Sequence, residues 1–294
     1  MRKLSCKHLS DVLAPRIGFP YLVALGQTVE VEVANCFGRF PGVELPPRGA
    51  NPVTGPLAVE GVGPGDTIAV EIQQIETVGD GCIGTKDDLT VIPIDAASNT
   101  ALFAPGLRLP LAPMVGTIGV APAREAISTH RAGDHGGNMD CNIIRAGSTV
   151  CFDVQAPEAG LGMGDVHALM GDGEVSGQGI EAAAVVTMRV NKVPGLGLQR
   201  PYGLLEGRFF VVGWGANLEE AADKAQEDMV KMLTRFLGFP EAQARRFLGI
   251  ATDLRVGWRG GATPTVWLEL ALSRVPAAVG QALTGAMTAA VPSD

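Results

Sequence analysis

Aromatic and charged residues are both scarce in this chain of 294 residues. Phe, Trp and Tyr make up 5% of it and Asp, Glu, Lys and Arg 18%, against 46% of apolar residues. The core must therefore be built from aliphatic side chains, and the high apolar content excludes a disordered chain. A net charge of −8 without any run of Lys or Arg argues against nucleic-acid binding.

Three further features are missing from the sequence. No stretch of 18 apolar residues occurs, so we expect no membrane-spanning helix. Residues Met1–Ser10 lack the apolar segment of a secretory signal. The five cysteines are scattered and form no CxxC pair. This pattern predicts free thiols and a cytoplasmic location, rather than a disulfide framework or a zinc ribbon.

Turn-forming residues, by contrast, are plentiful. The chain has 39 glycines and 20 prolines, a content that favours short strands joined by many turns. Several segments alternate apolar and polar residues with the period of a half-buried strand. The strands predicted from alternation or from β-branched composition are residues 26–33, 67–75, 149–154, 182–190, 208–213 and 265–272.

The last third of the sequence has helical character. Asn217 is a suitable N-cap for an amphipathic helix that ends at Gly238, and Pro240 opens a second helix that stops near Gly249. The Ala/Gly/Thr-rich tail, residues 279–294, is expected to fray. We therefore predict a β-rich domain over residues 1–200 that carries the active-site loops, and an α+β part over residues 201–294 packed on it.

Titratable side chains concentrate between residues 134 and 181, in two segments rich in glycine. The first contains Asp134, His135 and Asp140, and the second contains Asp165, His167, Asp172, Glu174 and Glu181. Glycine lets backbone N–H groups approach a ligand, so Gly137, Asn138 and Gly173 are the expected substrate contacts. The pattern predicts a catalytic site at this cluster.

Two mechanisms fit these residue types. In one, His167, Asp140 and Asp165 hold a divalent metal, with zinc favoured over calcium, and His135 is the alternative to Asp165 as a ligand. Glu174 is then the expected general base, assisted by Asp172 and His135. In the other, a carboxylate activates water or Cys141 without a metal.

Several of these residues also have a structural interpretation, and Glu174 can face solvent at the start of a strand-like stretch. Asp172 and Asp140 can form or cap turns, and His135 can be a solvated loop residue. Glu181 can pair with an arginine. The inventory excludes two other catalytic designs, because no GxSxG nucleophile elbow and no lysine in a Gly/Ser-rich loop are present.

Four segments in order along the chain resemble the acetamidase/formamidase family. They are Asn51–Gly61 followed by Gly65-Asp66, Met114–Pro122, Gly136–Asp140, and His167–Glu174 running to Glu181. Ala251–Val256 also fits this family. The resemblance implies a mostly β fold with jelly-roll-like layers, plus a C-terminal strand–helix–helix–strand unit.

The same resemblance implies an activity and a state of assembly. The expected activity is hydrolysis of a small linear amide, such as formamide or acetamide, to a carboxylate and ammonia. Zinc or calcium, and homo-oligomers that are dimers or larger, are also implied. The alternatives are a lactamase-like hydrolase of a small cyclic amide and a non-catalytic ligand-binding homologue.

One segment departs from the expected family pattern. Val33-Ala34-Asn35 stands before Cys36-Phe37, where a Thr-His-Asp-like segment is expected. An imidazole and a carboxylate are therefore absent there, which puts metal binding, specificity and activity in question.

Overall fold

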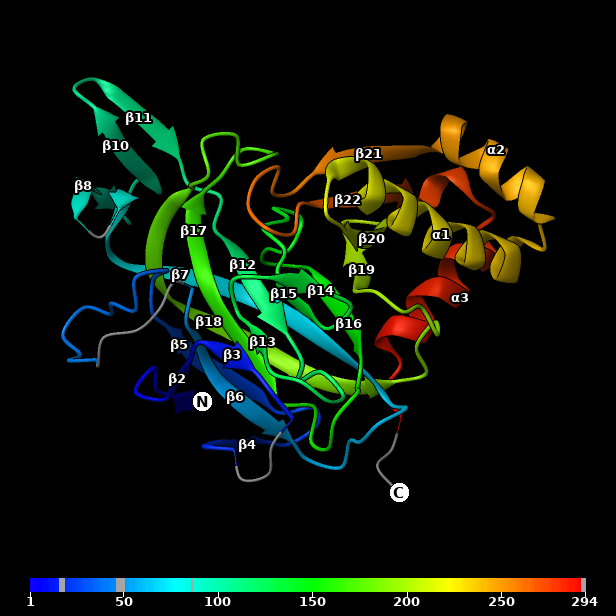
Figure 1. Cartoon of the computed structure of the whole chain (residues 1–294), viewed down its shortest axis with the longest axis horizontal. Coiled ribbons are helices and arrows are strands. Elements are labelled where there is room, and N and C mark those ends of the chain that lie inside the picture. The colour runs from blue at the N-terminus through cyan, green and yellow to red at the C-terminus, as the bar shows by residue number, and fades with distance from the viewer. Residues whose placement is uncertain (16–18, 46–50, 86, 292–294) are drawn as a thin grey trace.

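The computed structural model describes residues 1–15, 19–45, 51–85 and 87–291. Within these residues, 17 strands form one continuous, curled hydrogen-bonded sheet, and three α-helices lie in the C-terminal part of the chain. Figure 1 shows the helices gathered on one side of the molecule, beside β20 to β22. The predicted mostly-β class is confirmed.

Two long strands form the backbone of the sheet. β7 (Thr67–Thr85) and β18 (Ile180–Val193) pair antiparallel, and β18 also pairs with β5 (Thr28–Val33). β16 (Thr149–Asp153) pairs with β7 from Thr67↔Asp153 to Glu71↔Thr149. The strands predicted at residues 67–75 and 149–154 therefore lie side by side. The strand predicted at residues 67–75 continues to Thr85, past register shifts where it pairs with β18.

The strand that carries most of the site is β17 (Leu161–Leu169). It pairs along one edge with β12 (Met114–Gly119), and with β6 (Val53–Val59) and β18 along the other. β15 (Gly136–Asn138) adds to β12, and β14 (Ala132–Gly133) adds to β15. Five further short strands are β1 (Arg2–Leu4), β2 (Leu9–Ser10), β3 (Val12–Leu13), β4 (Tyr21–Val23) and β13 (Ile127–Ser128).

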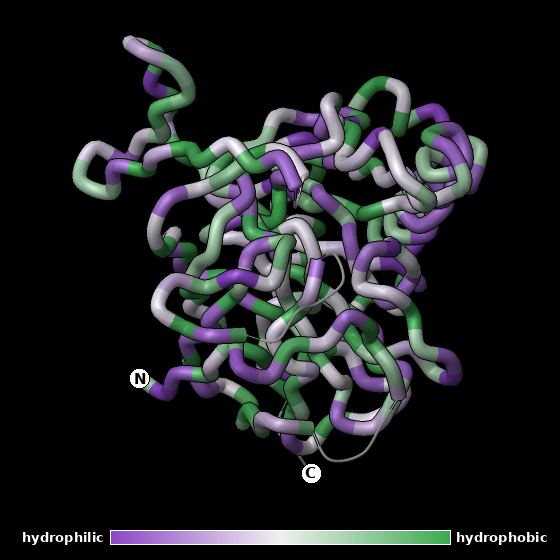
Figure 2. The backbone as a smooth tube through the Cα atoms, turned by 60° about the vertical axis from the view of Figure 1, so that its left-hand side comes forward, coloured by the Kyte–Doolittle hydropathy of each residue, from purple (hydrophilic) through white to green (hydrophobic). Residues whose placement is uncertain are grey.

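A small hairpin stands away from the body. β8 (Asp88–Ile92) continues the sheet from β7, and β9 (Ile94–Asp95), β10 (Thr100–Ala104) and β11 (Leu107–Pro110) form a separate three-stranded sheet. The hairpin of β10 and β11 projects from the molecule in both views (Figures 1 and 2). We call β10 and β11, with their connecting turn, the projecting hairpin.

The C-terminal strand–helix–helix–strand unit is also confirmed. β20 (Arg208–Trp214) leads to α1 (Leu218–Leu237), α2 (Glu241–Ala251), β21 (Thr252–Val256) and β22 (Thr265–Ala271). Asn217 caps α1 by accepting a hydrogen bond from the Glu220 N–H, and Gly238 ends it in the left-handed region with φ 67°. Both helix signals in the sequence therefore act as predicted.

The prediction that the tail frays is wrong for most of its length. A short 3₁₀ turn (Leu272–Arg274) is followed by α3 (Ala277–Thr288), and residues 292–294 lie outside the described part of the chain. Leu283 and Met287 on α3 are completely buried in the hydrophobic cluster beneath α1. Tertiary packing, rather than intrinsic propensity, therefore stabilises this helix.

Two large hydrophobic clusters form the core. One lies among the strands of the β-rich part, and the other joins the three helices to β20 and β22. β19 (Tyr202–Leu205) pairs with β16 as well as with β20, so the sheet continues across the predicted boundary at residue 200. The division into two domains stays a prediction. None of the helices in the described residues combines the length and apolar composition that crossing a bilayer requires.

We expect all five thiols to be free but slow to react in the native protein. Every cysteine is buried, and none of these five described residues forms a disulfide. Burial raises the pKa of the Cys6 thiol to about 12 and raises the pKa of Cys141 well above its usual value, so little thiolate is available. Titration with a thiol reagent should count five groups after unfolding without reductant and close to none before it. A count of three or one in the unfolded protein would contradict this prediction.

Candidate active site

A cavity of about 150 Å³ opens where β17, the start of β18 and the turn after β21 meet. Seven titratable side chains line it, and six of them are buried. These six are Cys36, Asp140, Asp165, His167, Glu174 and Glu181, and the exposed one is His130. The cavity therefore combines a small volume with an unusual density of buried charge.

The strand geometry explains how three of these residues meet. Asp165 and His167 are two positions apart on β17, so both side chains point to the same face of the sheet. On β18, Glu181 is the direct partner of His167 in the antiparallel register. Cross-strand pairing thus brings the imidazole against the Glu181 carboxylate.

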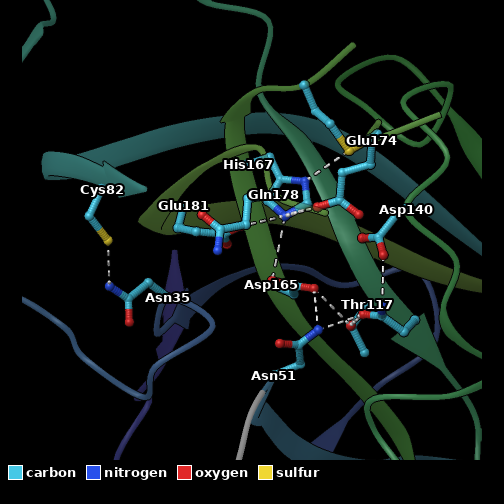
Figure 3. A network of polar contacts seen from close by, with 12 residues as sticks. Asn35, Asn51, Cys82, Thr117, Asp140, Asp165, His167, Glu174, Gln178 and Glu181 are labelled. Atoms are coloured by element: carbon cyan, nitrogen blue, oxygen red, sulfur yellow. Dashed lines mark hydrogen bonds and ion pairs between the residues drawn. The ribbon is translucent and has the colours of Figure 1, made fainter. Parts of the chain in front are cut away.

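His167 lies at the centre of a ring of carboxylates (Figure 3). Its Nε2 is 3.2 Å from Glu181 Oε1, 3.6 Å from Asp165 Oδ1 and 3.9 Å from Glu174 Oε1. All four side chains are between 1% and 5% exposed. Gly179 permits this packing, because a Cβ there would lie 2.7 Å from Cγ of the His167 ring.

The backbone at the site is strained. Among the described residues, eight non-glycine residues have positive φ, and four of them touch this cavity. These four are Asn51 (φ 53°), Asp140 (φ 44°), Asp165 (φ 56°) and Glu174 (φ 40°). Non-glycine residues in the left-handed region cost on the order of 1 kcal/mol each and cluster at functional sites. This concentration supports a functional role for the cavity.

Burial and mutual repulsion disturb the protonation of the cluster. Burial, followed by the charge of Asp165, raises the pKa of Asp140 well above its usual value. Burial likewise raises the pKa of Glu174, to about 7, and that of Glu181. Burial alone would lower the pKa of His167, but the charges of Glu181 and Asp165 raise it well above 6.5. Burial and like charges thus disfavour full ionisation of Asp140, Glu174 and Glu181 together.

Two carboxylate oxygens are left without a partner. Oδ1 of Asp140 and Oε2 of Glu181 are buried and accept no hydrogen bond from any described residue. Three sets of side chains offer ligand atoms within 4.8 Å of one another. These sets are Asp140–Asp165–His167, His167–Glu174–Glu181 and Cys36–Asp165–Glu181. A divalent cation held by one of these sets would offset the buried negative charge.

A network of buried amides holds Asp165 and Asp140 in place. Asn51 donates one hydrogen bond to Asp165 Oδ2 (2.7 Å) and one to Asn138 Oδ1 (2.8 Å). Thr117 also donates to Asn138 Oδ1 (2.6 Å), and Asn138 in turn donates to Asp140 Oδ2 (2.6 Å). Asn138 therefore lines the cavity as expected, with its side-chain amide already engaged.

The structure brings Glu174, Asp140, Asp165, His167 and Asn138 together, but Asp172 lies elsewhere. Asp172 is exposed in a different cleft, where it accepts hydrogen bonds from Asn142 (2.6 Å) and Arg255 (3.3 Å). Because the chain turns tightly at Gly171–Gly173, the side chains of Asp172 and Glu174 enter different clefts. Its interpretation as a turn residue fits better than a catalytic role.

His135, also expected to be catalytic, does not line the cavity either. It is buried beside a separate pocket that Trp214 also lines, and its Nε2 finds no hydrogen-bond partner in the described part of the chain. His135 belongs to the turn between β14 and β15, and its ring lies over Gly133, where a Cβ would be 2.6 Å from Nδ1. Neither Gly137 nor Gly173 lines the cavity. Gly137 pairs with Ile118 in the sheet, and Gly173 donates its N–H to the Val256 carbonyl.

His135 should instead make the fold sensitive to acid. Burial lowers its pKa from 6.5 to about 4, so the unfolded chain takes up this proton first as the pH falls. Stability from this residue is therefore present above pH 6.5 and is lost between 6.5 and 4, by roughly 3 kcal/mol in total. In denaturant unfolding, H135Q should lose less free energy of unfolding between pH 7 and pH 4 than the wild type. The exposed His130 supplies the control variant H130Q, and equal losses in wild type and H135Q would contradict the prediction.

The sequence did not predict that Cys36, Asn51 and Trp258 line the cavity, or that Thr117 contacts the cavity residue Asn138. Glu181 was named in the cluster but was given no catalytic role. Asn51 and Thr117 lie in two of the segments that carry the family resemblance, so a signal was present. Asn35, by contrast, accepts hydrogen bonds from the N–H groups of Phe37 and Arg39 and so closes a turn. Cys36 and Phe37, which directly follow the segment that departs from the family pattern, line the cavity, whereas Asn35 does not.

Comparison with known proteins agrees with this fold. Residues 122–258 match the Acetamidase/Formamidase family. An acetamidase from Bacillus halodurans is 30% identical, with a TM-score of 0.84 over 92% of this chain and 98% of that one. A predicted acetamidase/formamidase from Thermoanaerobacter tengcongensis is 29% identical, with a TM-score of 0.85 over 92% and 95%.

A formamidase of Methylophilus methylotrophus is 40% identical over 72 residues, which are 24% of this chain and 18% of that relative's length. The agreement with the two solved structures, by contrast, extends over almost the whole chain. The chain belongs to the acetamidase/formamidase family.

Proposed function

We propose that this protein hydrolyses a small linear amide to a carboxylate and ammonia, with the help of a divalent metal. One observation carries the proposal: three buried carboxylates surround His167, and one of them, Glu174, has its pKa raised by burial to about 7. Membership of a family named for amidases supports the reaction class.

Asp140, Asp165 and His167 are the residues that would hold the metal. The partnerless oxygen of Asp140 and the excess of buried negative charge fit a cation. The imidazole, with the Cys36 thiol close by, favours zinc over calcium, which prefers oxygen ligands alone. When bound, such a metal lowers the pKa of water and polarises a carbonyl group.

Glu174 performs the proton transfer. A carboxylate with a pKa near 7 can both take and return a proton at neutral pH. Glu174 takes a proton from the attacking water and passes it to the amide nitrogen, as the C–N bond breaks and ammonia leaves. The acyl carbon keeps the water oxygen and leaves as the carboxylic acid. The acid gives its proton to ammonia, so that carboxylate and ammonium are the final products at neutral pH.

Asn138 acts in this scheme by orienting Asp140 rather than by binding substrate. Its amide oxygen already accepts from Asn51 and Thr117, and its amide nitrogen donates to Asp140. This arrangement leaves the other oxygen of Asp140 without a hydrogen bond and available to bind the metal.

The test is product formation from a panel of amides, with and without added zinc. We expect ammonia from formamide or acetamide and a clear gain with zinc. Ring opening of γ-butyrolactam without ammonia release from linear amides would instead favour a lactamase-like enzyme. No product from any amide, together with retained binding of carboxylates, would favour a non-catalytic homologue.

We also propose a cytoplasmic homo-oligomer, a dimer or larger. The free buried thiols support the compartment. Exposed apolar side chains on and beside the projecting hairpin, Val91, Phe103 and Leu107, support self-association. Light scattering should give a mass of at least twice the 30.5 kDa of one chain. A mass equal to that of one chain would contradict assembly.

A further inference from the structure

One wall of the cavity comes from the C-terminal part of the chain. Trp258 lies in the connection between β21 and β22, whereas β17, β18 and the loops near them supply the carboxylates. Its side chain is largely buried, and the His130 ring stands edge-on to the indole at 5.5 Å between centroids. With Phe37, these two rings form the aromatic part of the lining.

The backbone that carries the indole is fixed in this wall. The main-chain N–H of Trp258 donates to Thr265 Oγ1 (2.8 Å), and the Thr265 N–H donates to the Trp258 carbonyl (2.9 Å). Gly260 and Gly261 leave the space that the ring occupies, since a Cβ at Gly261 would overlap the indole. The ring therefore has little freedom to withdraw when a larger group enters the cavity.

We propose that Trp258 is a specificity-determining residue that limits the size of the acyl group. The inference rests on the proposed function. The carboxylates and His167 are the charged part of the lining, so the reacting amide group belongs beside them. The acyl group must then lie against the aromatic lining, within a total volume of about 150 Å³. The C-terminal part thus selects the substrate, while the β-rich part carries the chemistry.

The backbone next to Trp258 also fixes the segment that carries Glu174. Gly173 donates its N–H to the Val256 carbonyl (2.6 Å) and accepts from the Arg259 N–H (3.2 Å). Both hydrogen bonds use main-chain atoms, so a smaller side chain at position 258 leaves them in place. Substituting the indole should therefore alter substrate choice more than proton transfer.

The test compares kcat/KM for formamide, acetamide, propionamide and butyramide in wild type, W258F and W258L. We expect the ratio of butyramide to acetamide to rise about 10-fold or more in W258L, and less in W258F, because two added methylenes gain room. Formamide, which has no acyl carbon chain, should change least. The control is V175A, since Val175 is 71% exposed on the same loop as Glu174 and does not line the cavity.

An unchanged ratio in a W258L protein that melts cooperatively would overturn the proposal. Failure of the proposed function gives a different result, namely no turnover of any amide by the wild type. In that case zinc-loaded protein is titrated with acetate and with butyrate, and thermal stabilisation is measured. Stabilisation of the wild type by acetate alone, and of W258L by both, supports the size limit. The same preference in both proteins, or no stabilisation by either ligand, contradicts it.

Discussion

Replacing Glu174 by glutamine is expected to lower kcat for acetamide by about 10²–10⁴-fold, the usual contribution of general acid–base catalysis. Glutamine keeps the shape of the side chain and removes its ability to take up a proton. The effect should appear in kcat rather than in KM, because the substrate contacts are unchanged. Steady-state ammonia release at pH 7 provides the measurement.

Asp172 supplies the matched control for this variant. It lies two residues before Glu174, is exposed and does not line the cavity, so D172N should retain turnover close to that of the wild type. Metal content and melting temperature are compared in both variants. Near wild-type turnover in E174Q, at unchanged metal content, would mean that Glu174 is structural.

Replacing Asp140 by asparagine is expected to change stability in opposite directions with and without metal. Burial and the charges of Asp165 and Glu174 disfavour a carboxylate at this position in metal-free protein. D140N should therefore melt at a higher temperature than the wild type in the presence of a chelator. With zinc the order should reverse, because a ligand at 100 times its Kd stabilises the wild type by about 2.7 kcal/mol and the variant has lost one ligand.

The metal affinity itself gives a second readout of D140N. We expect it to fall by at least about 10–100-fold, the loss that follows from removing even an outer partner of a ligand. Equilibrium dialysis against zinc measures it independently of turnover, again with D172N as control. Equal zinc affinity in D140N and wild type would remove Asp140 from the ligand set.

The sequence predicted those parts of the fold that depend on local patterns. Alternation placed β5, β7, β16 and β18, and the caps at Asn217 and Gly238 placed α1. It missed α3, because the helix depends on Leu283 and Met287 fitting into a core built by distant segments. A composition rich in Ala, Gly and Thr carries no local sign of that burial.

The site was predicted to a similar extent and for similar reasons. Asp165 and His167 were grouped only by their place in a glycine-rich segment, because no strand was predicted at residues 161–169. The period of β17 is what points both side chains to one face. The partners Asn51, Thr117 and Glu181 could not be placed beside them, since strand register and a crossing loop bring them in from elsewhere in the chain. Glu174 was separated from Asp172 only by the direction of a glycine-rich turn, in which Glu174 has a φ of 40°. Backbone angles of this kind are set by tertiary contacts rather than by residue type.

The most direct test of the central claim is to follow both products of acetamide hydrolysis at once. Protein stripped of metal and reloaded with zinc is incubated with acetamide, and acetate and ammonia are quantified by nuclear magnetic resonance. We expect equal amounts of acetate and ammonia from the reloaded wild type, and a rate at least about 10²-fold lower from E174Q. Zinc-loaded wild type that forms neither acetate nor ammonia above the buffer rate would contradict it.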